Sequence, residues 1–199
     1  MSKKAATDHP VHELIGARWS PYGFADRPVS REDLRSLLEA ARWAPSSYNE
    51  QPWSYILATR EDAPEFEKVL SCLVEPNQAW AQAAPVLMLC CTRLNFARND
   101  KPNAAAIHDL GLAAGNLCFE ATARGLAVHQ MIGILPDKAR ADFAIPDEVQ
   151  AVTAMAIGYA ADPESLPENI KARDTAPRQR KPLADFVFAG RWGETAPKV

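Results

Sequence analysis

The strongest constraint on the fold is a long helical segment, residues 103–124, in which the apolar residues Ile107, Leu110 and Leu117 recur on one face. Gly125 follows it, at the position where many helices end in a left-handed residue. A helix that is small and apolar all round is usually buried, with close neighbours. We therefore expect the central helix here, in a monomer's core or at a subunit interface. Its small residues are Ala104, Ala105, Ala106, Gly111, Ala113, Ala114 and Gly115.

Shorter elements surround this helix. Ser30 and Asp33 form an approximate capping box, which predicts a helix that ends before Pro45. The pattern also predicts strands over 54–59, 86–91, 127–132 and 152–157, and helices over 66–73 and 136–143. Because strands and helices mix without a regular βαβ alternation, an α+β sandwich is favoured over a doubly wound sheet.

Composition excludes several classes of protein. The 199 residues are 47% hydrophobic and 24% charged with a net charge of −3, so a basic footprint for nucleic acid is missing. The longest apolar run, 83–91, is too short to span a bilayer, and the polar N-terminus does not predict a secretory signal. The four cysteines and four histidines lack the spacing of a zinc site. We expect a soluble cytoplasmic protein with buried cysteines, without a nucleic-acid, membrane or metal partner.

The C-terminal part differs from the rest of the chain. Residues 160–182 are rich in proline and charge, and apolar residues resume after them. A structureless segment of this length is uncommon within a compact domain. We therefore predict a single domain over residues 1–199, in which 160–182 form an extended arm and 183–199 a tail that docks on this chain or on a partner subunit.

Two early segments carry candidate binding groups. In the first, Arg18-Trp19-Ser20-Pro21-Tyr22-Gly23-Phe24, an extended chain would point Arg18 and Ser20 the same way. A cation beside a hydroxyl suits a phosphate, although a surface arginine beside a turn serine explains the pair as well. The second, residues 44–53, sets amides between two prolines and a tryptophan. Those amides could form hydrogen bonds to the edge of a heteroaromatic ring. The alternative is that the segment is a plain turn.

Taken together and in order, these segments resemble the nitroreductase family of FMN-dependent oxidoreductases. The first corresponds to R-x-S-x-[RK]-x-[FY] followed by P-V, and the second to P-S-x-x-N-x-Q-P-W. Later residues are similar to the family's central helix, flavin-facing strand end and basic R-K-P-L ending. The matching positions are Arg18, Ser20, Phe24, Pro28, Val29, Pro45, Ser46, Asn49, Gln51, Pro52, Trp53, Asp109, Gly111, Ala113, Asn116, Leu117, Ile132, Gly133, Gly158, Tyr159 and 178–183.

The resemblance implies an α-β-α sandwich with a mainly antiparallel sheet, and a homodimer that exchanges its C-terminal arms. It implies that FMN binds through its phosphate to arginines and Ser20, through its pyrimidine edge to Asn49, and near N5 to the backbone N–H of Gly133. The loop before Asn49 would line the ring, largely from the partner subunit. The implied FMN contacts are Arg18, Trp19, Ser20, Tyr22, Pro45, Ser46, Ser47, Asn49, Gln51, Ile132, Gly133, Arg178 and Arg180.

The implied function is reduction of nitroaromatic or quinone-type acceptors by NADH or NADPH. Both substrates would use one pocket in turn, which gives ping-pong kinetics, and the flavin rather than a protein nucleophile carries the chemistry. Two alternatives stay open. One is a flavin enzyme of the same fold with other chemistry, such as reductive dehalogenation or flavin cleavage. The other is a non-catalytic flavin-binding module.

The chain departs from the family pattern in two places. Tyr22 stands where the family often has Arg or Lys, which puts one phosphate or ribityl contact in doubt. The candidate lids over the acceptor, residues 75–83 and 92–103, are short. His129, near the flavin-facing strand, is interpreted as a core histidine rather than an acid. The physiological acceptor and the choice between NADH and NADPH do not follow from the sequence.

Overall fold

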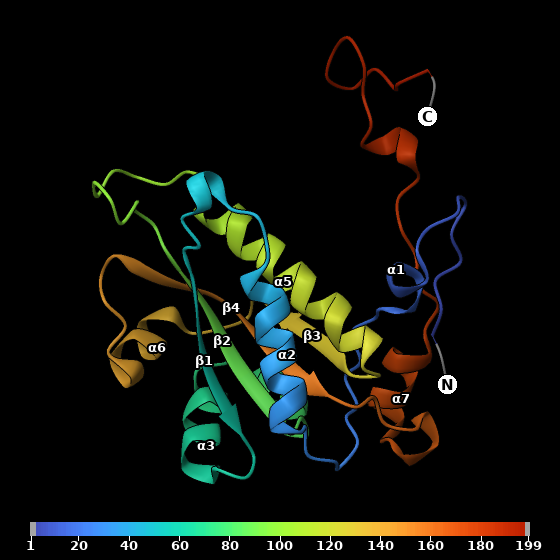
Figure 1. Ribbon diagram of the computed structural model, residues 1–199. Helices are drawn as coiled ribbons and strands as arrows, with labels where there is room; N and C mark the ends of the chain where they lie inside the picture. Colours follow the sequence, from blue (N-terminus) through green and yellow to red (C-terminus); the bar gives the residue numbers. More distant parts are fainter. Residues whose placement is uncertain (1–2, 198–199) are drawn as a thin grey trace.

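A four-stranded antiparallel sheet lies at the centre of the computed structural model, which describes residues 3–197 (Figure 1). The strands are ordered β1-β2-β4-β3, so that β1 and β3 form the two edges. Their bounds are β1 Trp53–Thr59, β2 Val86–Arg93, β3 Ala127–Met131 and β4 Val149–Gly158. The fold is therefore α+β, as the order of the elements predicted, and its sheet is antiparallel, as the family resemblance implied.

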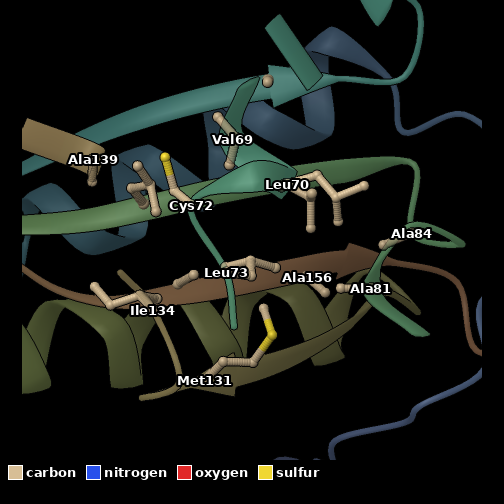
Figure 2. Close-up of a cluster of buried hydrophobic side chains, with 14 of the residues drawn as sticks. Val69, Leu70, Cys72, Leu73, Ala81, Ala84, Met131, Ile134, Ala139 and Ala156 are labelled. Atoms are coloured by element: carbon tan, nitrogen blue, oxygen red, sulfur yellow. The ribbon is translucent and has the colours of Figure 1, made fainter. Parts of the chain in front are cut away.

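Helices cover both faces of this sheet because its central strands are apolar on both sides. Met88 of β2 and Met155 of β4 pack with α2 (Arg31–Arg42) and α5 (Ala106–Ala123). Leu87 and Ala156, one position along, point the opposite way, as expected for a period of two. On that side they pack with α3 (Ala63–Ser71), α4 (Glu75–Ala81) and α6 (Pro136–Phe143), in the cluster that Figure 2 shows. The result is an α-β-α sandwich.

Local sequence signals predicted α2 and α5, the two helices that cover one face of the sheet, and the structure contains both. The Ser30 hydroxyl accepts the Asp33 backbone N–H at 3.0 Å, which caps α2. At the end of α5, Gly125 has a φ of +73° and the Leu126 N–H donates to the Ala121 carbonyl at 2.8 Å. Most of the residues of α5 that face the sheet and α2 are fully buried.

The segment over residues 160–182 differs from the extended arm that the sequence predicted. It contains a short 3-10 turn, Pro163–Ser165, and a helix, α7 (Glu168–Thr175). The sequence did not show α7 because the helix is polar and lacks an apolar period. It nevertheless packs on the domain, where Ile170 contacts the core.

After α7 the chain leaves the sandwich and extends away from it (Figure 1). Trp192 in this tail is 93% exposed and Phe186 is 57% exposed. Residues 198 and 199 of the predicted tail, and residues 1 and 2 of the predicted domain, lie outside the described residues. Within residues 3–197, no helix is both long enough and apolar enough to cross a membrane.

Gly158, the last residue of β4, is a position of close approach. An added Cβ would lie 2.5 Å from Pro85 Cδ and 3.0 Å from Phe24 Cδ1, and a proline ring has little freedom to move. We expect Gly158→Ala to lower the free energy of unfolding by about 1–3 kcal/mol, the usual cost of overpacking. Urea unfolding measures this change. The double variant with Pro85→Ala should recover part of the loss, and a single variant as stable as wild type would contradict the account.

Candidate functional site

Arginines from opposite ends of the chain line one cavity of about 500 Å³. Arg18 directly follows α1 (Glu13–Ala17), and Arg178 and Arg180 lie beyond α7. We call these three residues the cation cluster. Lys181 lines the same cavity, and Asp8 is the acid in its lining. The predicted convergence of residue 18 with the C-terminal arginines is therefore present within a single protomer.

Hydrogen bonds between the chain ends position this cluster. The Arg178 guanidinium donates to the carbonyls of Gly16 at 2.7 Å and Lys3 at 2.9 Å. The Asp174 carboxylate, only 4% exposed, accepts the backbone N–H groups of Tyr22 at 2.8 Å and Gly23 at 2.9 Å. The end of α7 and the segment after it therefore hold the chain on both sides of Arg18.

The electrostatics of the cluster favour an anion. Burial lowers the pKa of Arg178, and repulsion by Arg18 and Arg180 lowers it further. Arg18 and Arg180 therefore both act on Arg178. A phosphate would relieve this repulsion and would accept short hydrogen bonds from guanidinium groups.

The first motif has the local geometry that its sequence predicted. Arg18 Nη1 donates to Ser20 Oγ at 3.2 Å, so that the cation and the hydroxyl lie side by side. Trp19 lines a second cavity of about 500 Å³ together with Arg18 and Arg27. The Lys3 ammonium lies 5.0 Å from the centroid of the Trp19 ring.

Tyr22 lies outside the cation cluster, in an aromatic group on the other side of its segment. Its ring packs edge-on against Trp80, 5.0 Å between centroids, and His129, 4.6 Å. The Arg173 guanidinium lies 4.8 Å from the Tyr22 ring centroid. In this structure, Tyr22 packs against the core, which is its physical difference from the arginine or lysine of the family pattern.

His129 is a largely buried histidine in this aromatic group. Its Nδ1 lies 2.8 Å from the Pro21 carbonyl, which only accepts hydrogen bonds, so Nδ1 carries a proton and donates. Burial lowers the pKa of His129 from its ordinary value, although the Pro21 contact and the charge of Asp174 oppose the shift. The ring is therefore neutral at pH 7, as a core histidine would be.

This lowered pKa predicts a pH dependence of stability. Unfolded His129 binds a proton near pH 6.5, whereas the folded residue resists it, so protonation favours the unfolded state. The free energy of unfolding should therefore fall as the pH drops below about 6.5. Urea unfolding at pH 7 and pH 5 measures this, and His129→Gln should reduce the difference between the two values. An unchanged difference would contradict this assignment.

The second motif forms a loop with strained backbone, which we call the polar loop (residues 45–51). Tyr48, Asn49 and Gln51 have φ values of +53°, +55° and +52°, in the left-handed region that residues other than glycine rarely adopt. Such strain persists only where the surrounding structure enforces it, and it gathers at functional sites. The polar loop therefore carries left-handed strain at three of its seven residues.

Three contacts enforce this conformation. Ser46 Oγ accepts the Gln51 backbone N–H at 3.0 Å, and the Gln51 side-chain amide donates to the Asn49 carbonyl at 3.1 Å. Asp109 of α5, only 2% exposed, accepts the Ser47 N–H at 2.9 Å. The buried carboxylate fixes the polar loop at the start of the central helix.

Within one protomer the polar loop and the cation cluster lie at different ends of α5. Asp109 contacts the loop, whereas Phe119 lines the cavity of the cation cluster. From Asp109 to Phe119 the helix rises by about 15 Å. Figure 1 shows the same separation, with the polar loop near the start of α5 and α1 near its end. One chain alone therefore does not place Asn49 beside Arg18.

Gly133 follows β3 in a close contact with α4. Its carbonyl accepts the Asn77 side-chain amide at 3.0 Å and the Val74 N–H at 3.1 Å. An added Cβ would lie 2.5 Å from Asn77 Nδ2. No acceptor for the Gly133 N–H lies among residues 3–197. The neighbouring Ile132 side chain is 87% exposed, which leaves an open surface beside a free donor.

Sequence reasoning missed Asp174 and gave Asp109 no role. Asp174 lies in a polar tail without a periodic pattern, and its partners are about 150 positions away in the sequence. Nothing local could therefore indicate it.

Among residues 3–197, no group of three or more His, Cys, Asp or Glu side chains could hold a metal ion.

Comparisons with known proteins agree with this architecture. The family model described as "Nitroreductase family" matches residues 15–159. A solved structure of an oxidoreductase containing FMN is 34% identical, covers 98% of this chain and 99% of its own, and has a TM-score of 0.89. A 15.4 kDa protein of the ask 5′ region of Mycolicibacterium smegmatis is 34% identical over 131 residues, 66% of this chain and 87% of that protein.

A functionally named relative is more distant. The major NAD(P)H-flavin oxidoreductase of Aliivibrio fischeri is 32% identical over 94 residues, which is 46% of this chain and 43% of that protein. The family model spans most of the chain and includes both motifs, the central helix and all four strands. The chain belongs to the nitroreductase family.

Proposed function

We propose that this protein is an FMN-dependent oxidoreductase that uses NADH or NADPH to reduce nitroaromatic or quinone-type acceptors. The observation that carries the proposal is the convergence of Arg18, Arg178 and Arg180 on one cavity. The FMN-containing structure and the NAD(P)H-flavin oxidoreductase among its relatives support the choice of cofactor and reductant. Since reductant and acceptor would use one pocket in turn, ping-pong kinetics are expected.

The residues present fit FMN. The cation cluster, with Ser20, would hold the phosphate through charge-assisted hydrogen bonds. The Gly133 N–H lacks an acceptor among the described residues and would donate to the ring near N5. The amide of Asn49 would bind the pyrimidine edge. When bound, FMN would supply the hydride-accepting centre, and the protein would orient it.

We propose a homodimer as the functional unit, because each chain holds the halves of the site about 15 Å apart along α5. Ile107, Leu112 and Phe119 on α5 stay exposed, 52%, 36% and 37% respectively. Two copies of α5 packed in opposite directions would cover them. The same packing would bring the polar loop of one chain to the cation cluster of the other, and the exposed tail would cross to the partner.

A flavin titration tests the proposed function. The purified protein should carry or take up FMN, with absorbance near 450 nm, and NADH or NADPH should bleach it in the absence of oxygen. A nitroaromatic or a quinone should then restore the colour, and initial rates should give parallel double-reciprocal lines. A protein that cannot be loaded with FMN, or whose flavin neither nucleotide reduces, would contradict the proposal.

A further inference from the structure

The polar loop carries an exposed aromatic cluster that core packing does not account for. The Tyr48 ring is 75% exposed, and its centroid lies 5.8 Å from that of Phe96 at an interplanar angle of 81°. The Arg98 guanidinium lies 4.3 Å from the Tyr48 centroid and 5.1 Å from the Phe96 centroid. We call Tyr48, Phe96 and Arg98 the outer cluster.

Two segments far apart in sequence hold the outer cluster together. Phe96 and Arg98 belong to the loop between β2 and α5, which closes on itself through the Phe96 N–H to the Lys101 carbonyl at 2.8 Å. The Ala97 N–H donates to the Glu50 carboxylate of the polar loop at 2.5 Å. The loop between β2 and α5 is therefore held against the polar loop, whose Asn49 is proposed to bind the pyrimidine edge of FMN.

The conformation of Tyr48 adds a second observation. Its left-handed backbone costs free energy for a residue with a side chain. The ring gains little burial in return, because most of its surface stays exposed. A large ring held outward at such a cost, beside a proposed cofactor contact, is suited to stacking on a planar ligand.

The charge of Arg98 is left available. Glu50 binds the Ala97 N–H, and the Asp100 carboxylate lies 3.3 Å from the Asn95 amide and 3.6 Å from the Arg93 guanidinium. Among residues 3–197, no carboxylate forms an ion pair with Arg98. A guanidinium that rests on two rings keeps its in-plane N–H donors free for an external anion.

We propose that the outer cluster recognises the electron acceptor, and that it selects flat aromatic or quinoid acceptors that carry a carboxylate. The rings of Tyr48 and Phe96 pack against the acceptor, and Arg98 binds its carboxylate with two parallel hydrogen bonds. The inference rests on the proposed function, since it requires that the polar loop lies beside the flavin in the dimer.

A matched pair of ligands tests the proposal. The probes are 4-nitrobenzoate and its neutral analogue 4-nitrobenzamide, titrated calorimetrically into the FMN-loaded wild type and Arg98→Gln. Arg98→Gln should raise the Kd of the benzoate about tenfold and change that of the amide less than twofold. Arg98→Lys, which keeps the charge without the fork, should recover part of the loss. Arg31→Gln, an exposed arginine in the first turn of α2, is the control and should change neither Kd.

The kinetic readout separates recognition from folding. For 4-nitrobenzoate, Arg98→Gln should raise KM with kcat unchanged. Higher salt should narrow the difference in KM between the variant and the wild type. Equal effects on both ligands, or none, would overturn the proposal. Because the calorimetric comparison needs no turnover, a wild type that binds the benzoate through Arg98 and reduces neither compound would refute the proposed function alone.

Discussion

The Arg18→Ala/Arg180→Ala double variant is expected to bind FMN about 100- to 10,000-fold more weakly than wild type. Each guanidinium would donate to the phosphate, and a hydrogen bond to a charged group contributes about 1.5–3 kcal/mol. Two such losses convert to this range at about 1.4 kcal/mol per tenfold change. Fluorescence titration of the apoprotein with FMN measures the affinity.

The stability of the same variant separates binding from folding. Arg18 forms a hydrogen bond to Ser20, and Arg180 bonds only to the neighbouring Gln179 carbonyl within the described part of the chain, so neither supports the core. The melting temperature of the apoprotein should therefore stay within a few degrees of wild type. Arg31→Ala removes an exposed charge elsewhere and should leave FMN binding unchanged. FMN affinity within threefold of wild type in the double variant would contradict the phosphate assignment.

Asp174→Ala is expected to lower the free energy of unfolding by about 2–6 kcal/mol. The carboxylate is buried and accepts the N–H groups of Tyr22 and Gly23. Alanine would leave both donors without an acceptor, and each unsatisfied buried donor costs about 1–3 kcal/mol. Urea unfolding, with the slope compared between variant and wild type, measures the change.

Two further variants define what Asp174 contributes. Asp174→Asn keeps one accepting oxygen, so it should lower the free energy of unfolding by roughly half as much as Asp174→Ala does. Glu61→Ala removes an exposed acid from a turn and should change stability by less than about 0.5 kcal/mol. If Asp174→Ala proved as stable as Glu61→Ala, the two backbone contacts would not support the fold as argued.

Elements with a local signal could be predicted from the sequence. The cap at Ser30 and the glycine after α5 act within a few residues, and both have the predicted hydrogen bond or backbone angle. The central strands β2 and β4 are largely buried and the edge strands β1 and β3 only partly, yet the sequence indicated all four within a few residues of the observed ends. The α+β class followed from the order of these elements.

Features that depend on distant partners could not be predicted in this way. The helix α7 is mostly polar, and its place depends on Asp174 and Ile170 contacting the domain. The side chain of Tyr22 turns toward Trp80 because aromatic packing is available there. Neither contact can be predicted from the spacing of nearby residues in the sequence.

The candidate site was predicted in part, through resemblance and not through spacing. The resemblance placed Arg18 with Arg178 and Arg180, and they line one cavity in the structure. The strain in the polar loop did not follow from the sequence, because left-handed backbone at Tyr48, Asn49 and Gln51 arises from contacts with Ser46 and α5. The assignment of all these residues to FMN stays a proposal.

The most direct test of the account compares FMN with riboflavin, which has the same ring and ribityl chain and lacks the phosphate. Calorimetric titration of the wild-type apoprotein should give a Kd for FMN at least about 100-fold below that for riboflavin. In the Arg18→Ala/Arg180→Ala variant, which keeps Arg178 and Ser20, the difference between the two Kd values should be much smaller than in the wild type. Equal affinities in the wild type would show that arginines from the two chain ends do not hold a phosphate, and the central claim would be wrong.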